Sequence, residues 1–300
     1  MWSNNLRLSF WPADFLIDDF VRFFGFNLFV YGFINLSICG RGCNESTLRI
    51  RTIRQFMRTN VTTRYLLAFT SLFFVLHELH EQAHTSVGRL LCGCWGIRGF
   101  NVWELCEACS TSWAPAAALV AGPLFSYSLA WRGFYWLGED SIRRKALGFS
   151  LVFGTVMQAR LLTAVMGGGD EVSLLRLLTH QHGLGRWLGL AATTLLALPP
   201  LWRAFQQLHR SNRWLLFLSF ALLPLITEFI LVFKGLDGLL KRGIGAGSGV
   251  LGMPMIVTVW TGLMLVGALA TYSWLSTLFV EESTEHEKYV DRGQFMNKQT

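Results

Sequence analysis

Two histidines and a glutamate with the spacing of a zinc site lie in the first third of the chain. The segment His80–His84 has the form H-E-x-x-H, and His77 and Glu78 precede it by less than one helical turn. On a helix, residues four positions apart share a face, so both imidazoles can reach one metal ion. The alternative for such a face is a polar seam between packed helices, in which these side chains bond one another.

Apolar residues surround this motif. Tyr65–Leu76 precedes it, and Val87–Cys92 follows it. An ionisable side chain at the centre of a bilayer costs roughly 2.5–3.5 kcal/mol on insertion scales, so such residues usually have a functional reason to be there. The concentration of histidine and glutamate within two helical turns therefore predicts a functional site.

The composition predicts an all-α, multi-pass integral membrane protein whose solvent is the lipid bilayer. Of its 300 residues, 52% are hydrophobic and 15% are charged, and the mean hydropathy is +0.39. A membrane-spanning helix needs about 20 consecutive, mostly apolar residues. Six or seven transmembrane helices are expected, in windows at Val21–Cys39, Tyr65–Cys92, Trp113–Leu137, Ala146–Met166, Trp187–Trp202, Trp214–Phe233 and Val250–Val280.

The net charge of +7 is a topology signal. Basic residues concentrate in three connections, Arg41–Arg64, Arg143–Lys145 and Arg203–Arg213, which the expected helices put on one side of the membrane. Cytoplasmic loops carry such an excess of lysine and arginine. No basic motif or aromatic platform of a nucleic-acid-binding module is present, so no nucleic-acid partner is expected.

The H-E-x-x-H motif late in a transmembrane helix resembles the site-2 protease family of intramembrane zinc metalloproteases. Ala118–Tyr127 contains Ala121–Pro123, which is similar to the family's A-G-P-x-x-N segment on the next core helix. Asp170 follows the third expected core helix, where the family has its third zinc ligand, and Gly167–Gly169 can unwind that helix beside it. The resemblance covers roughly residues 65–175.

The resemblance implies a three-helix metalloprotease-like core in which His80, His84 and Asp170 hold Zn²⁺. Asp237, in a literal Asp-Gly pair, is the alternative third ligand. Ser126 stands where the family has the asparagine that holds extended substrate, so it is a candidate substrate contact. The family motif lies toward the cytoplasmic end of its helix, whereas the charge distribution here puts that end away from the basic loops.

The activity implied is hydrolysis of a transmembrane or membrane-proximal peptide in a membrane protein or peptide substrate. Glu81 would activate a zinc-bound water and later protonate the leaving amine. This mechanism does not need His77 and Glu78. They are candidates for residues outside the ligand set that orient the ligands or the substrate. The alternatives are a metal-binding transporter or scaffold without proteolysis, and a di-iron membrane oxygenase.

Four cysteines flank a short aromatic loop after the motif. Three alternatives account for them, namely a structural zinc site, two disulfides or unpaired thiols, and the disulfides are favoured if the loop lies outside the cytoplasm. They are Cys92, Cys94, Cys106 and Cys109.

The chain is expected to divide into four regions. An N-terminal interfacial segment with a possible transmembrane helix and a basic loop comes first, and a polar C-terminal tail comes last. Between them lie the metalloprotease-like membrane core and additional transmembrane helices. The regions are, in order, 1–64, 65–186, 187–280 and 281–300.

Overall fold

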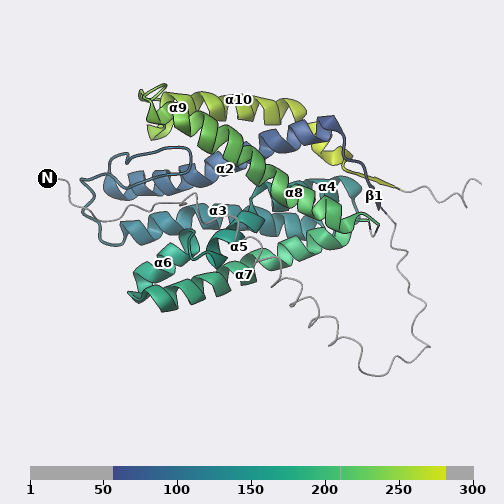
Figure 1. Cartoon of the computed structure of the whole chain (residues 1–300), viewed down its shortest axis with the longest axis horizontal. Helices are drawn as coiled ribbons and strands as arrows, with labels where there is room; N and C mark the ends of the chain where they lie inside the picture. The colour runs from purple at the N-terminus through teal and green to yellow at the C-terminus, as the bar shows by residue number, and fades with distance from the viewer. Residues whose placement is uncertain (1–56, 210, 282–300) are drawn as a thin grey trace, which may run out of the picture. The chain divides into compact units, whose positions relative to one another are not determined.

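The computed structural model describes residues 57–209 and 211–281, which are mostly helical (Figure 1), as the composition predicts. Its one sheet has two short antiparallel strands, with Met57 opposite Glu281. The elements are β1 (Met57–Thr59), α2 (Thr63–Cys92), α3 (Ala114–Trp136), α4 (Ile142–Gly154), α5 (Met157–Val165), α6 (Asp170–Thr179), α7 (His182–Gln207), α8 (Arg213–Thr227), η2 (Glu228–Leu236), α9 (Asp237–Lys241), η3 (Val250–Gly252), α10 (Met255–Thr271), η4 (Tyr272–Thr277) and β2 (Phe279–Glu281).

Five helical stretches within the described residues are long and apolar enough to cross a membrane, which supports the expected membrane protein. Each overlaps an expected span. They are Ala114–Trp136, Ile142–Val165, His182–Gln207, Arg213–Lys241 and Met255–Thr277.

Helix α2 is 30 residues long but is not one of these five. Its first half is apolar, whereas the histidines and glutamates of its second half lower its hydropathy. The expected span at Val21–Cys39, most of the basic loop and the polar tail from residue 282 onward lie outside the described residues.

Aromatic side chains join α2, α4 and α8. The ring centroid of Phe220 lies 5.9 Å from that of Tyr65, 5.5 Å from that of Phe69 and 5.0 Å from that of Phe149, each in an edge-to-face arrangement. In lipid, helix association depends on packing rather than on removal of apolar surface from water. Aromatic pairs contribute about 0.5–1.5 kcal/mol each beyond area burial, so this cluster fixes how α2 lies against its neighbours.

The third core helix is broken, whereas the sequence suggested one continuous helix over Ala146–Met166. Helix α4 ends at Gly154 and α5 begins at Met157. Between them, Val156 has φ of 58°, in the left-handed region that β-branched residues rarely adopt. The Thr155 hydroxyl donates to the carbonyl of Leu151 at 2.9 Å, within the last turn of α4. The break redirects the chain, so that α5 and α6 present polar side chains to α2.

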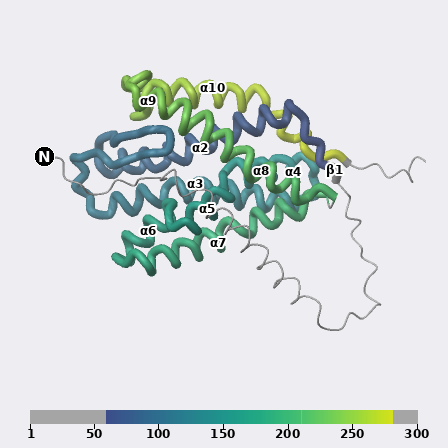
Figure 2. The backbone as a smooth tube through the Cα atoms, viewed as in Figure 1, coloured from purple at the N-terminus to yellow at the C-terminus, as the bar shows by residue number. Residues whose placement is uncertain are grey.

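The helix bundle has two ends, and different loops and helix ends lie at each of them (Figure 1, Figure 2). The loop that follows α2 and the short helix α6 lie at one end, with the turn from α9 to α10. The strand β1 and the start of α8 lie at the other end. Because His84 is on the last third of α2, the H-E-x-x-H motif belongs to the first of these two ends.

The helices after residue 187 pack directly on the expected core. Helix α7 lies against α6 and α3, and α10 lies against α2. The described residues 57–209 and 211–281 belong to one compact unit.

Candidate metal centre

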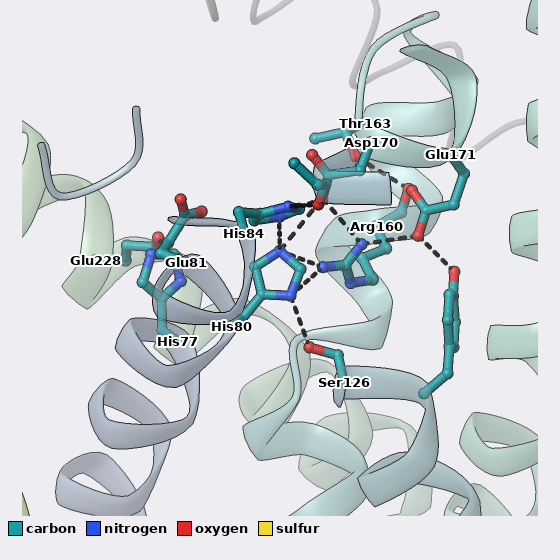
Figure 3. Close-up of polar contacts among 12 residues, drawn as sticks. His77, His80, Glu81, His84, Ser126, Arg160, Thr163, Asp170, Glu171 and Glu228 are labelled. Atoms are coloured by element: carbon teal, nitrogen blue, oxygen red, sulfur yellow. Dashed lines mark hydrogen bonds and ion pairs between the residues drawn. The ribbon is translucent and has the colours of Figure 1, made fainter. Parts of the chain in front are cut away.

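Three potential metal ligands converge at the carboxyl end of α2 (Figure 3). The Nε2 atoms of His80 and His84 are 3.1 Å apart, and Asp170 Oδ2 lies 3.2 Å from the first and 3.5 Å from the second. Both histidines are buried, and His84 has no exposed surface. These three residues form a group that could hold a metal ion, and within residues 57–209 and 211–281 it is the only such group.

The spacing of the three atoms fits a tetrahedral ion. Ligands bound at about 2.0–2.1 Å in a tetrahedron lie about 3.3–3.4 Å from one another, and the observed separations of 3.1, 3.2 and 3.5 Å bracket that value. Three protein ligands leave one tetrahedral position open, as catalytic zinc sites require.

The other ring nitrogens are also engaged, in the manner expected of metal-binding histidines. Nδ1 of His84 lies 2.6 Å from the carbonyl oxygen of Ala118, which can only accept a hydrogen bond. In a metal-bound state, this contact would keep a proton of His84 on Nδ1 and leave the lone pair of Nε2 for the metal. Nδ1 of His80 lies 3.0 Å from Ser126 Oγ. Ser126, expected as a substrate contact, therefore contacts a candidate ligand.

Gly122, in the Ala121–Pro123 segment of α3, makes room for the two imidazoles. A Cβ atom at this position would lie 2.2 Å from His84 Nε2 and 2.5 Å from His80 Cε1, closer than real Cβ contacts. The Ala-Gly-Pro segment thus supplies the flat wall against which both histidines lie.

Replacing Gly122 with alanine is expected to remove the metal while the helices remain, because the new methyl group would occupy the space of His84 Nε2. Metal content and circular dichroism of the purified variant measure both effects. Gly262→Ala, on the open face of α10, is the matched control and should keep its metal. Full metal content in Gly122→Ala would contradict the proposed position of the ion.

Asp170 begins α6, immediately after a glycine with φ of 89°. Burial raises the pKa of its carboxyl, but the neighbouring His84 and hydrogen bonds from both histidines outweigh burial and hold that pKa well below its usual range. Asp170 is therefore a carboxylate, the form that binds metal. Asp237, the alternative third ligand, pairs with Lys241 at 2.7 Å and does not belong to the group.

Glu81 belongs to a second polar cluster beside the first. Figure 3 shows its carboxylate near His77 and Glu228, on the side of His80 away from Asp170. Nδ1 of His77 lies 3.3 Å from Glu228 Oε1, and one buried oxygen of Glu81 has no hydrogen-bond partner among the described residues. The H-E-x-x-H glutamate is thus next to the ligands along the chain, and its Oε2 atom accepts no hydrogen bond from the described residues.

The loop after α2 adds an arginine to this second cluster. Arg98 Nη2 lies 2.8 Å from Glu78 Oε2, Arg98 Nη1 lies 3.8 Å from Glu81 Oε2, and the arginine side chain is 1% exposed. A short hairpin positions it, with Arg98 opposite Trp103. The ring of Trp103 stacks on that of His84, with centroids 4.7 Å apart. One loop therefore contacts a candidate ligand and the expected general base.

Two nested disulfides hold the base of that loop. Cys92 pairs with Cys109, and Cys94 with Cys106. The structure therefore has the disulfide alternative and not the structural zinc site. Disulfides persist in oxidising compartments, so we expect this end of the bundle to lie outside the cytoplasm, as the distribution of basic loops also predicts.

Labelling from outside sealed cells tests this orientation. In a variant with serine at positions 39 and 43, a membrane-impermeant reductant should expose the four remaining cysteines to an impermeant maleimide without permeabilisation. The physical reason is that both reagents reach only the non-cytoplasmic face. Labelling that requires permeabilised cells would contradict the expected orientation.

Several site residues were not identified from the sequence. Their side chains meet the motif from distant elements, so local spacing carries no signal for them. Among them, only Glu228 had a signal in the sequence, as the one acidic residue of an otherwise apolar stretch. These residues are Arg98, Trp103, Arg160, Glu171 and Glu228.

Comparison of the chain with protein-family models, curated proteins and solved structures finds no match.

Proposed function

We propose that this protein is an intramembrane zinc-dependent peptide hydrolase, similar in its core to site-2 proteases. The observation that carries the proposal is the convergence of His80 Nε2, His84 Nε2 and Asp170 Oδ2 at tetrahedral spacing, with Glu81 adjacent in the chain. Neutral imidazole and carboxylate are ligands that zinc prefers, and two histidines with one carboxylate recur in catalytic zinc sites.

The charge around the site also favours a divalent cation. Five largely buried carboxyl groups face only two guanidinium groups. Buried charge without a partner is strongly unfavourable, and a divalent ion would offset the charge of those carboxyl groups that are ionised. The carboxylates are Glu78, Glu81, Asp170, Glu171 and Glu228, and the guanidinium groups are Arg98 and Arg160.

A zinc ion held by these residues would supply a water acidified to a pKa of about 7 and a Lewis acid for the scissile carbonyl. With the ion bound, Glu81 would serve as the general base toward that water and would return the proton to the leaving amine. His80 and His84 keep their Nε2 atoms directed at one point because Ser126 and the Ala118 carbonyl hold the opposite ring nitrogens. The substrate is a membrane peptide, because the ligands lie among apolar spans.

A di-iron oxygenase is the less favoured reading of the same histidines. Such a centre needs enough histidine or carboxylate ligands for two ions. The described part of the chain brings together one group of three ligands, and His77 pairs with Glu228 outside it.

Cleavage of single-span model peptides in proteoliposomes tests the proposal. Wild-type protein loaded with zinc should cleave at least one peptide of a fluorophore–quencher panel, lose activity with a chelator and regain it with zinc. Glu81→Gln, loaded in the same way, is the inactive control. Zinc-loaded wild type that cleaves no peptide of the panel would overturn proteolysis and leave a metal-binding membrane protein.

A further inference from the structure

Arg160 is a charged residue that contacts the three-ligand group directly and has no place in the chemistry described above. It lies on α5, one turn after the break at Val156, and its side chain is 12% exposed. Figure 3 shows its guanidinium between His80 and Glu171. Arginine remains charged in proteins, so this is a permanent positive group beside the candidate ligands.

One side of the guanidinium is anchored. Nη1 lies 2.7 Å from Glu171 Oε1 and 3.5 Å from Asp170 Oδ2. The hydroxyl of Tyr127 donates to the same Glu171 oxygen at 2.8 Å, and the Tyr127 ring lies 5.7 Å from Arg160 Cζ. These contacts hold the guanidinium in one orientation and neutralise its charge.

The other side faces His80. Nη2 lies 2.8 Å from Nδ1 and 2.7 Å from Nε2 of that ring. A guanidinium nitrogen can only donate, and a neutral imidazole offers a single lone pair. In the ligand form of His80 that lone pair belongs to Nε2 and serves the metal, while Nδ1–H donates to Ser126 Oγ. His80 then has no acceptor left for Nη2, which becomes a donor without a partner beside His80 Nε2.

We propose that Arg160 is a catalytic residue whose Nη2 donates to the carbonyl oxygen of the scissile peptide as that oxygen becomes an oxyanion. This inference rests on the proposed hydrolase function. When water forms its bond to the carbonyl carbon, the carbonyl π electron pair moves to the oxygen, and Glu81 takes the proton of the water. Collapse restores the carbonyl, breaks the carbon–nitrogen bond and sends the proton from Glu81 to the amine.

The surroundings suit this role. Donors fixed in advance, in a site that excludes water, stabilise developing charge without reorganisation. Glu171 and Tyr127 provide the fixation, and the low dielectric of the bundle strengthens the interaction with the oxyanion. A neutral carbonyl in the ground state gains less from the same donor, so the effect falls on kcat.

Arg160→Gln, Arg160→Lys and the control Arg144→Gln test the role in zinc-loaded proteoliposomes. Arg144 is exposed and pairs with Glu139 on the opposite end of the bundle. Loss of one oxyanion donor should lower kcat about 10²–10³-fold with KM and zinc content unchanged, and the lysine variant should recover part of the loss. Arg144→Gln should behave as wild type.

Binding of a phosphinate peptide, a tetrahedral anion that mimics the oxyanion, provides a readout independent of turnover. Its affinity for Arg160→Gln should fall by a factor similar to the fall in kcat, because such analogues report transition-state binding. Wild-type kcat and wild-type phosphinate affinity in zinc-loaded Arg160→Gln would overturn the proposal.

If Arg160→Gln does not fold or does not hold zinc, Arg160→Gln/Glu171→Gln replaces it, because this variant leaves no unpaired buried charge. A reduced phosphinate affinity of the zinc-loaded double variant supports the proposal. If the double variant binds phosphinate as tightly as wild type, or fails to hold zinc, Arg160 is a structural partner and the proposal is overturned. Wild type that cleaves no peptide overturns the proposed function itself, whereas normal cleavage by Arg160→Gln overturns only the role of Arg160.

Discussion

Replacing Glu81 with glutamine is expected to lower kcat by about 10²–10⁴-fold, the contribution typical of a positioned general acid or base. Glutamine has nearly the same shape but cannot take up the proton of the attacking water. Because Glu81 is not one of the three converging ligands, the zinc content should stay at the wild-type level. Single-turnover cleavage of a model peptide in proteoliposomes, with zinc measured on the same sample, gives both quantities.

The matched control for this experiment is Glu139→Gln, which removes a carboxylate that is partly exposed and lies between α3 and α4. It should retain both zinc and kcat. A zinc-loaded Glu81→Gln protein that cleaves at the wild-type rate would remove Glu81 from the mechanism, and the remaining general-base candidates would be Glu78 and Glu228.

Replacing Arg98 with methionine is expected to destabilise the protein by about 3–5 kcal/mol, the cost of leaving a buried charge without its partner. Arg98 is the counter-ion of Glu78 and lies near Glu81, and both guanidinium and carboxylate are almost fully buried. Thermal unfolding in detergent, followed by near-ultraviolet circular dichroism, should show a lowered midpoint. The loop tryptophan Trp103 makes the signal sensitive to the contact with His84.

The double variant Arg98→Met/Glu78→Gln separates charge balance from loop anchoring. Removing both members of a buried pair is often nearly neutral, so most of the lost stability should return. Phe100 still anchors the loop, since it is fully buried against Phe73 and Phe74. A double variant as unstable as Arg98→Met alone would show that the ion pair is not the cause of the loss.

The parts of the site that the sequence predicts are those with local signals. His80 and His84 share a face because both lie on one helix, where four residues make about one turn. Asp170 was preferred over Asp237 from the order of helices and from the glycine run before it, and Asp170 is the aspartate that lies at the histidines. Five of the seven apolar windows likewise overlap helices that are long and apolar enough to span a membrane, because bilayer thickness sets a length that the sequence shows.

The remainder depends on tertiary contacts. Four cysteines allow three disulfide connectivities, and the nested one follows from how the loop folds over α2. Arg160 reaches His80 across 80 residues, after a break at Val156 that propensity does not foretell, since valine disfavours the left-handed region. Arg98 similarly contacts Glu78 only because the hairpin of the loop after α2 brings Arg98 back to that helix.

The most direct test of the metal centre is elemental analysis of detergent-purified wild type beside His84→Ala, Asp170→Ala and Asp237→Ala. Wild type should contain about one zinc per chain, as expected for a single tetrahedral site, and Asp237→Ala should contain the same amount. His84→Ala and Asp170→Ala should lose the ion. Wild type without metal, or a zinc content that survives loss of His84 and Asp170, would contradict the metal centre and leave a polar seam between helices.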